Sequence, residues 1–134
     1  MSQLPSLPED QDAQFEWFRL VVQLLREQGA SAVSETMRAG LDRFTRTNLP
    51  EHSFPAGLEQ QAFAAEVLKL KDNDTSWNRA LQSALVAAYD KAGAGEHLSA
   101  VEDLEAFART CPWALYAEVA RTEAERVAGL GQRE

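Results

Sequence analysis

Cysteine, histidine and basic residues are scarce in this sequence. It holds one cysteine, two histidines and 13 lysines and arginines, against 21 aspartates and glutamates. A single cysteine excludes an internal disulfide, which favours a reducing compartment, so we expect a cytoplasmic protein. The formal net charge of −8 disfavours nucleic acids and anionic membranes as partners, because both are bound through Lys and Arg.

Long apolar runs are also missing. No stretch approaches the roughly 18 apolar residues of a transmembrane helix, so we expect no membrane-spanning segment. The first residues, MSQLPSLPEDQD, lack the basic and apolar regions of a signal peptide. The chain has 45% apolar and 25% charged residues, a composition typical of a soluble globular domain.

Period-two alternation is absent, whereas helical periodicity recurs along most of the chain. The sequence therefore predicts an all-α protein, a compact bundle of five to six helices. We expect a flexible lead-in over residues 1–9, a single helical domain over 10–130 and a frayed C-terminus over 131–134. The helices are expected at about 12–28, from 31 or 34 to 47, 58–70, from 74 or 75 to 92, from 97–99 to 110, and 112–130.

Helix start and stop signals support these bounds. Asp10 or Asp12 is the expected N-cap of the first helix and Gly29 its end, and Ser31 or Ser34 caps the second. The polar stretch 71–76 is expected to separate the third and fourth helices.

The C-terminal part carries three further signals. Gly-Ala-Gly at 93–95 is a stop signal, and Pro112 suits the first position of the last helix. Ser99 with Glu102 has the form of a capping box. The expected buried side of the fifth helix is Leu98, Val101, Leu104, Phe107 and Ala108.

The first helix has an unusually wide apolar face. Wound at about 100° per residue, its apolar side chains cover roughly 220°, about twice what a surface helix needs. They are Phe15, Trp17, Phe18, Leu20, Val21, Val22, Leu24 and Leu25. We expect this helix, about 12–28, to be the central one of the bundle. If the other helices leave Trp17, Leu20 and Leu24 uncovered, a second copy of the chain must cover them.

No catalytic or metal-binding set is recognisable, so we expect neither an enzyme nor a cofactor. His52 and His97 do not follow a glutamate in the Glu-x-x-His pattern, and both are expected to be solvated or capping groups. A calcium loop from Asp72 fails because its sixth position is tryptophan rather than glycine. Cys111 lacks a base nearby in sequence, and a structural role is expected.

One segment is the best candidate for a contact surface. The densest group of carboxylates lies at the start of the fifth helix, and two aromatic residues follow at the start of the sixth. The candidate partner-binding residues are Glu96, Glu102, Asp103, Glu105, Trp113 and Tyr116. Acidic residues there also stabilise the helix dipole, whereas Trp and Tyr often anchor interfaces.

These observations favour a small acidic protein–protein interaction module. Our hypothesis is that it binds and neutralises or escorts a basic partner protein, in the manner of immunity proteins, antitoxins or secretion chaperones. The alternative is a self-associating module, a homodimer formed through the first helix. The sequence leaves open the partner, the oligomeric state and any small-molecule ligand.

Overall fold

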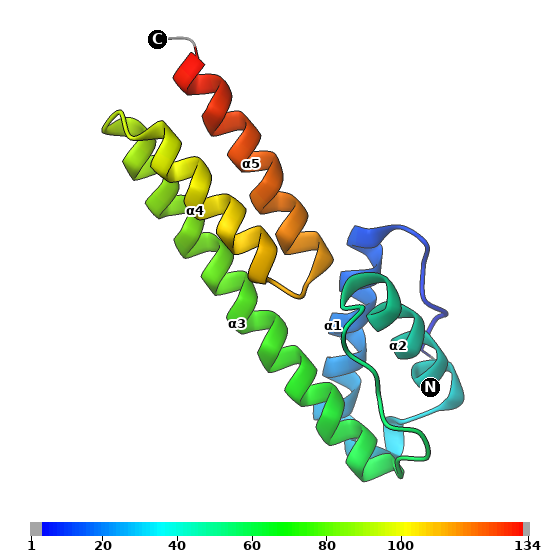
Figure 1. Ribbon diagram of the computed structural model, residues 1–134. Helices are drawn as coiled ribbons and strands as arrows, with labels where there is room; N and C mark the ends of the chain where they lie inside the picture. Colours follow the sequence, from blue (N-terminus) through cyan, green and yellow to red (C-terminus); the bar gives the residue numbers. More distant parts are fainter. Residues whose placement is uncertain (1–3, 133–134) are drawn as a thin grey trace. The chain divides into compact units, whose positions relative to one another are not determined.

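The computed structural model describes residues 4–132, and over these residues the protein is all-α, as predicted (Figure 1). The elements are α1 (Gln11–Gln28), the 3-10 turn η1 (Gly29–Ala32), α2 (Glu35–Asn48), α3 (Gln60–Gly93), α4 (His97–Thr110) and α5 (Ala114–Gln132). No strand occurs in the described range. The chain forms two compact units, one ending at Asn73 and one beginning at Asp74. The single domain over 10–130 stays a prediction.

The wide apolar face of α1 is buried. Of its eight apolar residues seven are buried and Leu20 is half-buried, whereas Glu16, Arg19 and Gln23 on the polar side are exposed. Trp17 and Leu24 are only 3% and 7% exposed, so no second chain is needed to cover them. The homodimer through this helix stays a prediction without a supporting observation.

Aromatic rings join α1 to α2. Phe18 stacks on Phe44 with ring centroids 4.8 Å apart, and Phe15 meets the same ring edge-on at 5.3 Å. The ring of Trp17 lies directly on Gly40, where an added Cβ would stand 2.5 Å from the ring atoms Cη2 and Cζ2. Glycine is therefore the residue that lets the indole reach the α2 backbone.

A buried polar cluster at the end of α2 adds a second link to α1. Asn48 is fully buried, and its side-chain amide donates to Gln14 Oε1 at 2.9 Å and to the Phe44 carbonyl at 3.0 Å. Its own Oδ1 accepts from Gln11 Nε2 at 3.2 Å. Because these groups satisfy one another, the amide is buried without an unpaired polar atom.

The residues before α1 are packed against it. Leu7 is buried, Trp17 Nε1 donates to the Pro5 carbonyl at 2.6 Å, and Gln14 Nε2 donates to the Pro8 carbonyl at 2.9 Å. These contacts give residues 5–8 a defined path along the helix. The flexibility expected of 1–9 stays a prediction, and residues 1–3 lie outside the described range.

The predicted caps of the first two helices are confirmed. Asp10 accepts from the Ala13 amide at 3.0 Å, and Ser34 accepts from the Met37 amide at 3.1 Å. Gly29 follows α1 with φ of 70°, a left-handed conformation that glycine adopts without strain. Ser31 lies inside η1, where its hydroxyl donates to the Gln28 carbonyl at 2.8 Å.

The predicted break at 71–76 is wrong, because α3 continues through it as one helix of 34 residues. The stretch contains Asp, Asn, Thr and Ser, which weaken a helix, but no Gly or Pro, which would end it. Within the second unit Asp74 is 4% exposed and accepts a hydrogen bond from the Tyr116 hydroxyl of α5. This contact stabilises the helix where its local propensity is low.

The stop signal at 93–95 is confirmed in detail. Gly95 has φ of 86°, its amide donates to the Ala92 carbonyl at 3.0 Å, and the Glu96 amide donates to the Lys91 carbonyl at 2.8 Å. This pair of hydrogen bonds is the Schellman motif that closes a helix. The motif reverses the chain, so that α4 runs back along α3 (Figure 1).

Helix α4 begins at His97 and ends at Thr110, as predicted, but the predicted cap of this helix and the predicted start of the next are wrong. Ser99 is not an N-cap: it lies inside α4, and its hydroxyl accepts from Lys91 Nζ at 3.0 Å. Helix α5 begins at Ala114, two residues after Pro112. It extends to Gln132, and residues 133 and 134 lie outside the described range, so the fraying expected over 131–134 stays a prediction.

Small side chains form the core of the second unit. Ala88 and Ala92 of α3, Ala100 and Leu104 of α4, and Ala124 and Val127 of α5 pack together. Alanines at these positions allow the three helices to approach closely, and Trp77 adds an edge-to-face contact with Phe107 at 5.7 Å. The inner sides of all three helices are thus occupied.

The close approach of Trp17 to Gly40 predicts a stability difference between two glycines. Gly40→Ala should lower the free energy of unfolding by about 1–2 kcal/mol, since overpacking outweighs the gain in helix propensity. Gly129 of α5 has no neighbouring atom within 4 Å of an added Cβ, so Gly129→Ala should be neutral or stabilising by up to about 1 kcal/mol. Urea unfolding measures both, and equal effects would contradict the packing described.

The buried Tyr116–Asp74 contact predicts a second difference, between two tyrosines. Tyr116→Phe should destabilise the protein by about 1–3 kcal/mol, because it removes a donor from a buried carboxylate. Tyr89 also donates to a carboxylate, Glu123 Oε2 at 2.5 Å, but on the surface. Tyr89→Phe should therefore change stability by less than about 0.5 kcal/mol. A Tyr116→Phe protein as stable as the parent in thermal unfolding would refute the role given to this bond.

Candidate functional site

The structure divides the six predicted site residues into two groups. Glu96 directly precedes α4, Glu102, Asp103 and Glu105 lie on α4, and all four are exposed. Trp113 and Tyr116 lie at the start of α5 and are buried. The acidic residues are therefore on the surface, and the aromatic pair belongs to the interior.

Trp113 and Tyr116 have structural roles here. Trp113 is fully buried, Tyr116 is 9% exposed, and their ring centroids are 6.1 Å apart. Because both side chains are buried, and the Tyr116 hydroxyl also donates to Asp74, a partner cannot reach either ring in this conformation. Trp113, Tyr116 and buried Ala120 have the spacing of residues on the buried side of a helix. This spacing is the sequence signal that indicates an interior position for the two aromatic residues.

The acidic residues are not equivalent. Asp103 Oδ2 pairs with Lys91 Nζ at 2.5 Å, and this hydrogen bond raises the pKa of Lys91 above its usual value. The charge of Asp103 is therefore locally balanced. Within the described residues Glu102 and Glu105 take part in no ion pair, so the i,i+4 spacing of Glu105 and Arg109 does not produce one. The charges of Glu96 and Glu102 add smaller contributions to the raised pKa of Lys91.

Leu98 was expected in the buried side of α4 but is 73% exposed. The buried row of this helix is Ala100, Leu104 and Ala108. Leu98 lies on the opposite side, in the same row as Glu102 and Glu105 at positions i, i+4 and i+7. We call these three residues the α4 outer face; Arg109 continues the same row in the last turn.

The α4 outer face combines an apolar side chain with two carboxylates. Leu98 is the most exposed large apolar residue in the described part of the chain. A carboxylate binds Lys or Arg, and an exposed leucine contributes apolar area once a partner covers it. The sequence predicted the exposed carboxylates but placed Leu98 on the buried side. The error arose because the apolar pattern does not fix on which side of the helix its first residues lie.

Negative charge is spread over the chain rather than confined to α4. Asp and Glu exceed Lys and Arg by four in residues 1–73 and again by four in residues 74–134. The whole chain therefore attracts cations at long range, and local geometry must decide where a basic partner docks.

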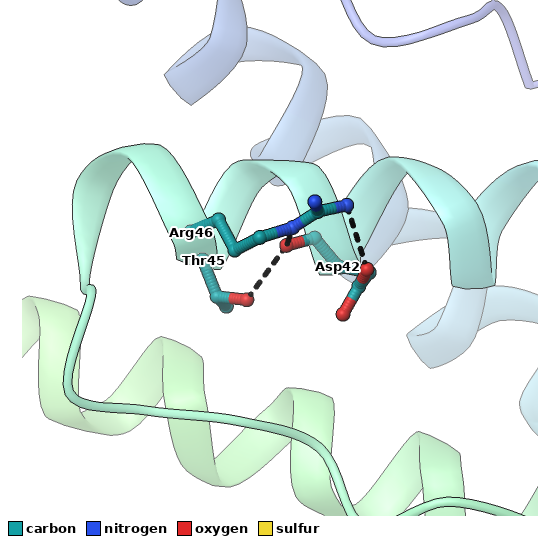
Figure 2. A network of polar contacts seen from close by, with 3 residues as sticks. All are labelled: Asp42, Thr45 and Arg46. Atoms are coloured by element: carbon teal, nitrogen blue, oxygen red, sulfur yellow. Dashed lines mark hydrogen bonds and ion pairs between the residues drawn. The ribbon is translucent and has the colours of Figure 1, made fainter.

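Basic side chains of α2 are engaged within their own unit. Arg46 Nη2 pairs with Asp42 Oδ2 at 2.9 Å, while the Thr45 hydroxyl donates to the Asp42 carbonyl at 3.1 Å (Figure 2). The guanidinium of Arg38 lies over the ring of Phe63, 4.7 Å from its centroid. These contacts hold two of the cations of α2 against their own unit.

The single cysteine is buried at the end of α4. Cys111 Sγ lies 3.7 Å from the Trp113 carbonyl, to which its thiol donates, and burial raises the pKa of the thiol. A raised pKa lowers the fraction of thiolate, the form that reacts as a nucleophile.

The histidines and carboxylates do not come together. His52 packs its ring edge-on against Phe54 at 5.0 Å, and its Nε2 is buried, so the expectation of a solvated group is wrong for this atom. His97 is the first residue of α4. Over the described residues no group of three or more His, Cys, Asp and Glu side chains is arranged to hold a metal ion.

Comparison with known protein families, curated proteins and solved structures found no match to this chain. None of the helices in residues 4–132 combines the length and apolar character needed to cross a bilayer.

Burial of Cys111 predicts slow reaction with thiol reagents. At pH 8 the native chain should react with an aromatic disulfide reagent at least about 100-fold more slowly than the chain unfolded in guanidinium. The chain is its own control, because it has only one thiol. Equal rates in the two states would show that the thiol is accessible.

Proposed function

We propose that this chain is a small acidic interaction module, acting in the cytoplasm, that binds a basic partner protein and neutralises or escorts it. The partner docks on the α4 outer face. No catalytic step is part of this proposal, and the class of partner is defined by charge.

One observation carries the proposal: exposed Leu98 lies in one row with exposed Glu102 and Glu105, neither of which is ion-paired in the described part of the chain. Protein interfaces commonly have an apolar centre with a polar rim, and this row supplies both within two helical turns. The matching surface on a partner is an apolar side chain flanked by Lys or Arg.

Electrostatics gives the proposal a kinetic consequence. The net charge of −8 attracts a basic protein over distances of about a Debye length, and the carboxylates of α4 orient it at contact. Asp103 contributes less because Lys91 balances it. The association rate should therefore depend on salt and on Glu102 and Glu105.

Photocrosslinking tests whether the α4 outer face contacts a partner. Leu98 is replaced by p-benzoylphenylalanine, and the chain is irradiated in lysate of its source organism. Leu130, which is 40% exposed on α5, takes the same replacement as the control. We expect a specific adduct with a basic protein from position 98 and none from 130. No adduct from position 98 would refute the docking site.

Charge reversal on α4 should then slow association with the crosslinked protein. Glu102→Lys with Glu105→Lys is expected to lower the association rate constant about tenfold at low salt, with a smaller effect at high salt. The matched control is Glu118→Lys with Glu125→Lys, the same charge change on two exposed residues of α5. If both double variants slow binding equally, only net charge matters and the proposed face is wrong.

A further inference from the structure

Residues 5–8 pack against α1 in the way that a protein binds a peptide ligand. Residues 5–8, Pro-Ser-Leu-Pro, lie along α1 without regular secondary structure. Their polar contacts are made by backbone carbonyls: Pro5 accepts from Trp17 Nε1 at 2.6 Å, and Pro8 accepts from Gln14 Nε2 at 2.9 Å. Leu7 supplies the buried side chain, at 6% exposure.

These contacts specify a simple chemical pattern. The two carbonyls and the Leu7 side chain make these contacts, whereas the side chains of Pro5 and Ser6 remain exposed. Proline suits such a ligand, because it has no N–H to leave unpaired and it favours an extended backbone at low entropic cost. Recognition of proline-containing segments on aromatic side chains is an established mode of peptide binding.

On α1, the Trp17 side chain that binds the segment is already held in its position by packing. The Trp17 ring cannot move toward α2, because it already rests on Gly40. The indole N–H is thus aimed at the segment by packing beneath the ring. Trp17 would keep this position for any backbone carbonyl offered in the same place.

A hollow remains beside the segment. It has a volume of about 400 Å³ and is lined by Pro5, Ser6 and Pro8 on one side and by Glu16, Trp17 and Leu20 on the other. Leu20 is the one residue of the wide apolar face of α1 that is only half-buried. The α1 wall of the hollow, at Glu16 and Leu20, offers a peptide from another molecule contacts that residues 5–8 do not fill.

We propose that the face of α1 around Trp17 is a binding site for extended peptides of the pattern Pro-Xaa-Leu-Pro. Residues 5–8 occupy it in the free chain, and a partner peptide displaces them by also contacting Leu20. Because residues 5–8 belong to the same chain, they compete at a high effective concentration. A partner peptide displaces them only if its affinity for the site is high enough to overcome this advantage. This site is separate from the α4 outer face and does not depend on it.

Fluorescence anisotropy with a labelled peptide tests the proposal on the full chain. The probe is acetyl-Leu-Pro-Ser-Leu-Pro-Glu-amide, the sequence of residues 4–9. Leu7→Asp should release the tethered segment, so this variant should bind the probe at least about tenfold more tightly than the parent chain. Leu130→Asp, a matched change at an exposed leucine, should leave binding as in the parent.

A second substitution locates the binding site. Adding Trp17→Phe to Leu7→Asp removes the indole donor, and we expect binding about fivefold or more weaker. A Leu7→Asp chain with native helix content by circular dichroism that binds no probe at about 1 mM overturns the proposal.

Two further outcomes are decisive. Should Leu7→Asp fail to fold, Leu7→Ala replaces it in the same anisotropy measurement: tighter binding of the probe than to the parent chain supports the site, and binding equal to that of the parent chain overturns it. A parent chain that is dimeric by light scattering, with the dimer lost in Leu7→Asp, makes a second copy the occupant and overturns the partner peptide.

Discussion

The hydrogen bond from the Tyr116 hydroxyl to Asp74 is the contact on which the second unit depends. It links positions 42 residues apart and places the start of α5 beside α3. A carboxylate that is 4% exposed would destabilise the fold unless donors surrounded it. With its donor in place, Asp74 becomes an anchor, and α3 passes through a stretch of weak helix formers without interruption.

The accessible surface of α4 follows from this anchor. Because α3 and α5 are held together, α4 packs against both of them through Ala100 and Leu104 and completes an alanine-rich core. The opposite side of α4 remains exposed to solvent. Leu98, Glu102 and Glu105 lie there. The proposed docking face is therefore the side of α4 that the three-helix packing does not use.

Local signals in the sequence predicted much of the fold. Caps such as Asp10 and Ser34, and the stop before Gly95, depend on neighbouring backbone and are confirmed. The sequence left the continuity of α3 open: 71–76 has no Gly or Pro to end a helix, but its weak helix formers are stabilised by Tyr116, 42 positions away. Leu98 was expected to be buried and Ser99 to be the N-cap, and both are wrong because the exact first residue of α4 could not be identified from its sequence pattern. For the candidate site, the carboxylates were predictable, whereas burial of Trp113 required the packed structure.

Amide hydrogen exchange over residues 71–78 tests most directly the claim that α3 is one continuous, anchored helix. The structure predicts protection at these amides close to that of the flanking turns at 64–70 and 81–88, because the helical hydrogen bonds run through the stretch. Exchange at 71–76 as fast as in the loop at 50–58 would contradict it, and would show two helices separated by a flexible break.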